Sequence, residues 1–222
     1  MNDHNISLGR AQESVLATNK VLKNTYLLLS MTLIFSGVMA AVSMAIEPPR
    51  MIGLFTFIGA IALLFVLNKT ANSPMGIAVV FGITGLLGFG LGPMLNSYMQ
   101  LSNGGELITT ALGGTGIIFL GLSGYALTSR RDFSFMGGML FVGLIVAFLL
   151  IIANLFMNIP AFSLAISALI ILVMSGFILY DTSRIIHGGE TNYVMATVSL
   201  YLNIYNIFVH LLSLLGVLGG DD

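Results

Sequence analysis

Long apolar stretches separated by short polar segments dominate this chain. Seven such stretches occur, at positions 25–46, 51–68, 76–98, 107–128, 133–157, 161–181 and 194–217. A helix of about twenty residues crosses a hydrocarbon core about 30 Å thick. Inside lipid, a helix also satisfies its own backbone hydrogen bonds. The pattern therefore predicts an all-α membrane protein, a bundle of seven transmembrane helices.

The composition agrees with a protein that lipid surrounds. Hydrophobic residues make up 57% of the 222 positions and charged residues only 8%. Soluble domains carry about 25% charged residues, so a water-soluble fold and a second soluble domain are excluded. The chain has no cysteine, which excludes disulfides and thiolate chemistry. The lipid bilayer is the first expected partner, and we expect no cofactor and no nucleic acid.

The polar and apolar segments divide the chain into three parts. Residues 1–24 are polar without a sustained apolar face, and we expect a mobile cytoplasmic tail. Residues 25–218 form the seven-helix transmembrane domain, and residues 219–222 a short non-cytoplasmic C-terminal tail. The first apolar stretch has no small-residue cleavage site, so we interpret it as a retained helix and not a signal peptide.

Basic residues fall almost entirely on one side of the predicted membrane. Seven of the eight lie in the N-terminal tail or in the loops after helices two, four and six: Arg10, Lys20, Lys23, Lys69, Arg130, Arg131 and Arg184. Arg50 is on the opposite side. Short loops rich in Lys and Arg stay in the cytoplasm. We therefore place the N-terminus in the cytoplasm and the C-terminus in the periplasm.

Glycine is abundant in the third and fourth predicted helices. It occupies positions 82, 85, 88, 90 and 92 in the third, and 113, 114, 116, 121 and 124 in the fourth. Small residues let membrane helices approach closely. We interpret both sets mainly as packing residues, with a bent or mobile third helix as the alternative.

Asp181, at the end of the sixth predicted helix, is the main ionisable candidate. A charge at bilayer depth is costly, so such a residue is a functional candidate by default. One interpretation is an interfacial carboxylate that pairs with Arg184, three residues later on the same helical face. The other is a titrating or cation-attracting group in a cavity, with Tyr180 beside it.

The seventh predicted helix carries a polar stripe. Asn203, Asn206 and His210 are three and then four residues apart, so they share one face. Such a face should point into the bundle, which predicts that helix seven is central. The stripe serves either interhelical hydrogen bonds or a sensing or pore-lining role.

The enzyme-like patterns are weak, and we expect no enzyme activity and no metal site. Ser123 with His210 is reminiscent of an intramembrane serine protease, but small-residue strings around serine are common in packed helices. An aspartyl protease needs two carboxyls that share a proton. Asp181 is the one carboxylate within the predicted spans.

Three segments resemble the transmembrane Bax-inhibitor-motif family: residues 81–95, residues 179–182 (Leu-Tyr-Asp-Thr) and residues 200–208. Residues 20–26 and 185–193 resemble bacterial inner-membrane members in particular. The resemblance implies seven helices, with helix seven surrounded by the other six. It also implies one of two roles, because some bacterial members are substrates and modulators of the membrane-anchored ATP-dependent protease FtsH, and others are pH-sensitive calcium leak channels.

The leading hypothesis is a bacterial inner-membrane protein that binds and modulates an FtsH-type protease and can be its substrate. Its contact would be the N-terminal tail, for example Arg10, Glu13 and Lys20. The alternative is a leak for Ca²⁺ or other cations gated around Asp181. A stabilising subunit with neither activity is a third possibility.

One position departs from the channel pattern. Channel members pair an Asp in helix six with an Asp in helix seven, and the second position here is Asn203, which cannot ionise. If the last loop turns at residues 188–189, Asn203 should also lie roughly 10 Å deeper than Asp181 by helical rise. A tilted helix or an off-centre turn would close that gap, and the sequence leaves open whether the two side chains touch.

Overall fold

The computed structural model describes residues 2–157 and 159–219, with only the backbone of residues 2–15, 17 and 160. Its helices are α1 (Asn2–Ile46), α2 (Ile52–Thr70), α3 (Pro74–Met99), α4 (Gly104–Ser129), the 3₁₀ turn η1 (Ser134–Met136), α5 (Gly137–Met157), α6 (Pro160–Ile186) and α7 (Tyr193–Gly219). Within these residues, seven helices are long and apolar enough to cross a membrane. The predicted seven-helix fold is confirmed.

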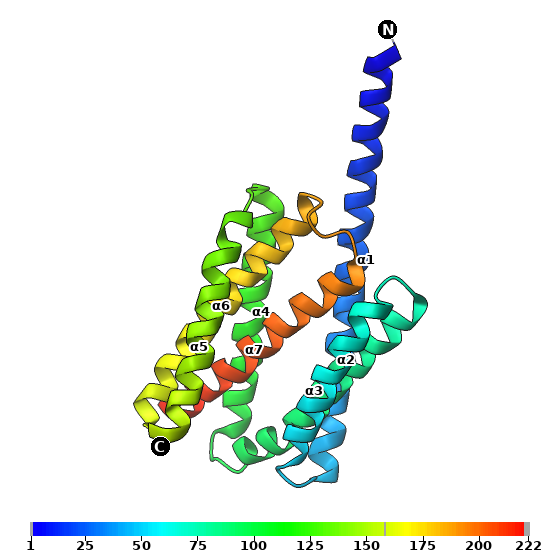
Figure 1. Cartoon of the computed structure of the whole chain (residues 1–222). Helices are drawn as coiled ribbons and strands as arrows, with labels where there is room; N and C mark the ends of the chain where they lie inside the picture. The colour runs from blue at the N-terminus through cyan, green and yellow to red at the C-terminus, as the bar shows by residue number, and fades with distance from the viewer. Residues whose placement is uncertain (1, 158, 220–222) are drawn as a thin grey trace.

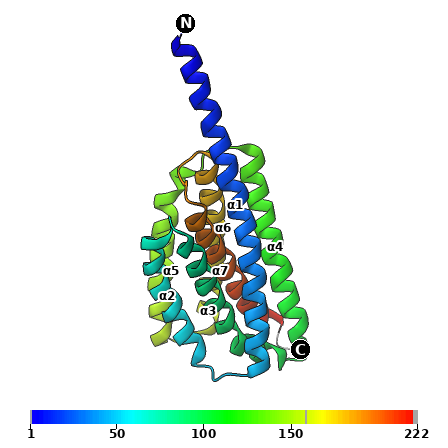
Figure 2. The same ribbon diagram turned by 90° about the vertical axis from the view of Figure 1, so that its right-hand side faces the viewer.

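Helix α1 is much longer than the first apolar stretch. Its membrane-compatible part is Thr18–Ile46, yet the helical backbone begins at Asn2. Figures 1 and 2 show this N-terminal end projecting from the bundle, at the end opposite the C-terminus. The segment predicted to be a mobile tail therefore continues the first helix. Of the predicted C-terminal tail, residues 220–222 lie outside the described part.

Helix α7 runs obliquely through the bundle (Figure 1). It packs against α1, α3, α4 and α6, whereas α2 packs on α3 and α5 packs on α6. Helix α7 is thus the central element, and four of the other six helices are its main partners. Its residues Thr197, Leu200 and Ile207 are fully buried.

Glycines of α3 allow α1 and α2 to approach closely. A Cβ atom added at Gly88 would collide with the backbone of Ser36 on α1, and one at Gly90 with Thr56 on α2. The packing interpretation holds for this helix, because a larger residue has no room there. Helices α1 and α3 make the most extensive helix–helix contact of the described structure.

The same interpretation is wrong for most glycines of α4. A Cβ atom at Gly113, Gly116, Gly121 or Gly124 would have no neighbour within 4 Å among the described residues. Of the five α4 glycines named in the sequence analysis, Gly114 alone approaches another helix, through Leu211 of α7; Gly104, the first residue of α4, also approaches Tyr98 of α3. These four glycines therefore do not bring α4 closer to a neighbouring helix within the described structure.

A buried tyrosine of α7 forms hydrogen bonds with both α1 and α3. Tyr201 of α7 is 1% exposed. Its hydroxyl donates a hydrogen bond to the Thr84 carbonyl oxygen of α3 at 3.3 Å. It lies 2.7 Å from the Ser36 hydroxyl of α1, from which it can accept. Inside lipid, where water cannot replace these partners, the pair of bonds fixes α7 against α1 and α3.

We expect Gly88→Ala to lower the stability of the bundle, because the new methyl group meets the Ser36 backbone. Overpacking of this kind costs about 1–3 kcal/mol. The matched control is Gly113→Ala, whose methyl group has no neighbour. Thermal unfolding of the purified protein in detergent measures both. Equal midpoints for the two variants would contradict the close packing of α1 on α3.

Candidate functional site

Asp181 and Asn203 are in direct contact. The Asn203 amide Nδ2 donates a hydrogen bond to Asp181 Oδ2 at 2.8 Å, which joins α6 to α7. Asn203 is 6% exposed, and Asp181 is half-buried five residues before the end of α6. The carboxylate therefore has a neutral donor at the position where the resemblance to channel members implied a second carboxylate.

The difference in depth expected from helical rise is closed in the structure, and a tilted α7, one of the two ways that the sequence left open, accounts for it. A helix that crosses the bundle obliquely gains less depth per residue than one along the membrane normal. Figure 1 shows this oblique course of α7 beside the steeper α6. Asn203 therefore reaches Asp181 although it lies further along its own helix.

Arg184 has a partner other than Asp181. Its Nη2 atom lies 3.8 Å from Glu190 Oε2 and donates to the Gly189 carbonyl oxygen at 2.9 Å. Its guanidinium also lies 5.7 Å from the ring centroid of Tyr180. Glu190 is in the loop after α6, and no spacing in the sequence marks it as this partner. Arg184 therefore pairs with Glu190 and not with Asp181, and this ion pair links the end of α6 to the loop that follows it.

Two hollows lie beside the Asp181–Asn203 contact. The larger, about 410 Å³, is lined by residues of α5, α6 and α7 that include Tyr180, Asp181, Asn203 and Asn206. The smaller, about 10 Å³, is lined by Asp181, Arg184, Glu190 and two residues of α7. That volume is close to the minimum that holds one water molecule. The carboxylate thus lies between a polar loop and a larger hollow.

His210 belongs to a separate hollow nearer the C-terminal end of α7. This hollow, about 360 Å³, is lined by His210, Ser167, Asn154 and Ser163, among others. His210 Nδ1 lies 3.2 Å from the Ser167 hydroxyl, and Asn154 donates to Ser163 at 2.7 Å. The predicted stripe is therefore divided, with Asn203 and Asn206 on one hollow and His210 on the other.

The serine–histidine pair that the sequence brings to mind is not formed. Ser123 lies 3.4 Å from the Thr182 hydroxyl on α6, whereas His210 contacts Ser167. Among the described hydrogen bonds, no carboxylate orients the His210 ring. The described residues also contain no group of three or more His, Asp and Glu side chains that could hold a metal ion.

Polar side chains also form hydrogen bonds between helix ends and loops at the end of the bundle from which the N-terminus projects. The Asn192 side chain accepts from the backbone of Val194 at 2.9 Å and donates to the Ala71 carbonyl oxygen at 3.1 Å. An asparagine just before a helix is a common cap, so this signal was available in the sequence. Ser183 of α6 accepts from the backbone of Phe133 at 2.9 Å. Both contacts fix the ends of α6 and α7.

Comparison with known proteins identifies the family. The family model "Inhibitor of apoptosis-promoting Bax1" matches residues 18–220. The chain belongs to this Bax-inhibitor family. A family member from Escherichia coli K12, named "Modulator of FtsH protease YccA", is 50% identical over 219 residues, which cover 99% of this chain and 100% of that protein.

Two further relatives match all or nearly all of the chain. A membrane protein of Vibrio cholerae is 51% identical over 211 residues, 95% of each chain. A protein of Pseudomonas aeruginosa is 45% identical over 222 residues, all of both chains. The family and the seven apolar helices together make this chain a multi-pass membrane protein.

The Asp181–Asn203 contact can be tested by a double-mutant cycle. We expect Asn203→Ala to destabilise the bundle by about 1–3 kcal/mol, because it leaves the carboxylate without its donor. Asp181→Ala in the same background should recover part of that loss. A coupling energy above about 0.5 kcal/mol from thermal unfolding in detergent is the expected result. Additive effects would show that the contact contributes nothing to stability.

Proposed function

We propose that this chain modulates an FtsH-type membrane-anchored ATP-dependent protease in the bacterial inner membrane. The relative named as a modulator of FtsH matches it over nearly the whole length of both chains. A second E. coli relative with the same identity is named an inner membrane protein. The observation that carries the proposal is the projecting end of α1, which offers a partner an extended segment outside the bundle (Figure 1).

The direction of this projection follows from the charge distribution. Lys20 and Lys23 are exposed where α1 leaves the bundle, and Arg130 is exposed in a loop on the same side. Short basic loops stay in the cytoplasm, so we infer that the projecting segment is cytoplasmic. A cytosolic unfoldase can reach it there, since exposed termini are the usual points of proteolytic attack. The side chains of Arg10 and Glu13, also proposed for this contact, lie outside the described part.

We expect deletion of residues 2–17 to slow degradation of the chain in cells that contain the protease and to weaken its effect on another protease substrate. The deletion ends before the membrane-compatible part of α1, which begins at Thr18, so the bundle should fold. Pulse-chase half-lives in cells with and without the protease measure the effect.

The matched control for this deletion replaces residues 2–17 by a Gly/Ser segment of equal length. It keeps the reach of the segment and removes its side chains. If the deletion and the replacement both behave like the natural chain, the projecting segment has no part in the interaction. A normal half-life for the replacement alone would mean that length, and not side chains, is recognised.

A second candidate function is a cation leak gated around Asp181. The observation that favours it is the Asp181–Asn203 contact between two hollows, because a carboxylate at that position can attract a cation. Ca²⁺ prefers six to eight oxygen ligands. The Asp181 carboxylate has the Asn203 amide and the Arg184 cation beside it, so the site suits passage of a cation better than tight binding. The amide at position 203 argues against a strong response to pH.

We expect Asn203→Asp to make calcium flux into liposomes depend on pH, since two carboxylates at this distance repel each other unless they share a proton. The matched control is Asn206→Asp, which adds a carboxylate to the same hollow. Asn206 bonds to its own helix at the Leu202 carbonyl oxygen and not to Asp181. Asp181→Asn should abolish flux. Equal flux from all variants and from empty vesicles would end this candidate.

A further inference from the structure

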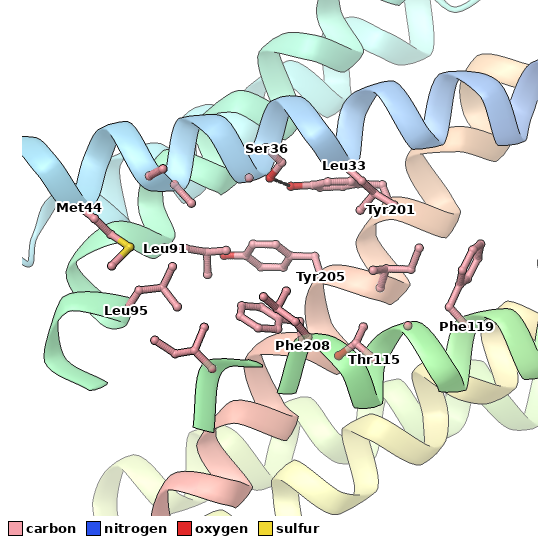
Figure 3. A pocket seen from close by; sticks show the side chains of 17 residues that line it. Leu33, Ser36, Met44, Leu91, Leu95, Thr115, Phe119, Tyr201, Tyr205 and Phe208 are labelled. Atoms are coloured by element: carbon pink, nitrogen blue, oxygen red, sulfur yellow. Dashed lines mark hydrogen bonds between the residues drawn. The ribbon is translucent and has the colours of Figure 1, made fainter. Parts of the chain in front are cut away.

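A large apolar cavity lies between α1 and α4, on the side of α7 away from Asp181. Figure 3 shows the side chains that surround it, and the stacked rings of Tyr201 and Tyr205 project from α7 between α1 and α4. Its volume is about 420 Å³. An engineered cavity of about 150 Å³ already holds a benzene molecule. This cavity is therefore large enough for an elongated hydrocarbon group.

The walls of this cavity offer almost no polar atoms. The Ser36 hydroxyl is bonded to Tyr201, and the Thr115 hydroxyl donates to the Ala111 carbonyl oxygen at 2.7 Å. Among the described residues, the Tyr205 hydroxyl is the one lining side-chain group without a hydrogen-bond partner in the protein. A buried water needs two to four polar partners, so water does not fill this space.

The cavity opens sideways between two transmembrane helices. Within the described residues, α1 and α4 do not form one of the packed helix pairs. Gly37 of α1 and Gly116 of α4 both line the cavity, and neither has a neighbour within 4 Å of its Cβ position. Exposed apolar side chains such as Ile34 (69% exposed) and Leu112 (57%) continue from the opening onto the outer surface. The cavity is thus continuous with the surface that faces lipid.

The position of the cavity along the helices indicates which leaflet it faces. Its α1 lining runs from Leu33 to Met44, in a span that ends at Ile46, and its α4 lining begins at Ile108, near the start of that helix. Both lie in the half of the bundle away from the projecting N-terminus. An empty cavity costs free energy in proportion to its volume, and at this depth hydrocarbon chains are the surrounding medium.

We propose that this cavity binds one acyl chain of a membrane phospholipid, which enters between α1 and α4 from the leaflet opposite the N-terminus. The chain would lie along α7 and contact the rings of Tyr205 and Phe208. The site is independent of the Asp181–Asn203 contact and of the projecting end of α1.

The test uses the full-length protein in nanodiscs of phosphatidylethanolamine and phosphatidylglycerol that contain a phospholipid with a photoreactive acyl chain. Peptides of α1 and α4 that line the cavity should be labelled more strongly than α5, whose exposed side chains report bulk lipid. Native mass spectrometry of the detergent-purified protein should also show one retained phospholipid.

Gly116→Leu fills the cavity, and we expect it to abolish both the excess labelling and the retained lipid. The matched control is Gly121→Leu on the same helix, where the added side chain also has no neighbour but does not line the cavity. It should keep both signals. Thermal unfolding in detergent verifies that both variants fold.

Three results would overturn the proposal. One is labelling of the cavity peptides no stronger than that of α5. Another is the same loss of signal in both leucine variants. The third comes from a photoreactive amino acid at position 112 in whole membranes: cross-links to a protein and not to lipid would assign the cavity to a partner helix.

Discussion

The absence of water at bilayer depth is the constraint on which this structure depends. Backbone groups are satisfied within each helix, so the remaining polar side chains need partners inside the protein. The Tyr201 hydroxyl finds Ser36 and Thr84, and the Asp181 carboxylate finds Asn203. The two Tyr201 bonds join helices that are far apart in the sequence, whereas the Asp181–Asn203 bond joins the consecutive helices α6 and α7. The few polar positions of the chain therefore determine which helices surround α7.

Much of the fold follows from the sequence because hydrophobicity and length suffice to define membrane-crossing helices. The polar stripe on α7 likewise predicts a central helix, since lipid does not accept it. The contact of Asp181 with Asn203 depends on the tilt of α7, which packing sets and composition does not encode. The open glycines of α4 look identical in sequence to the packed glycines of α3, and only the neighbouring helix distinguishes them.

Loops were the least predictable part of the site. Glu190 meets Arg184 because the chain reverses direction after Ile186, and the sequence does not define how that loop folds. Asn192 is different, because a capping residue directly before a helix is a local signal. A helix cap can be predicted from neighbouring residues in the sequence. A contact between a helix end and a loop depends on how the loop folds, and it can be identified only in the three-dimensional structure.

The close contact between α1 and α3, here called the seam, has a mechanical consequence. A motor that pulls on the projecting end of α1 applies its force directly to the helix with the most extensive contact in the described structure. The seam at Gly88 and the Tyr201 bond to Ser36 must then yield before any later helix can be withdrawn from the bilayer. Extraction from this end would therefore begin at the most extensive helix–helix contact of the described structure, and not at a weakly packed peripheral helix.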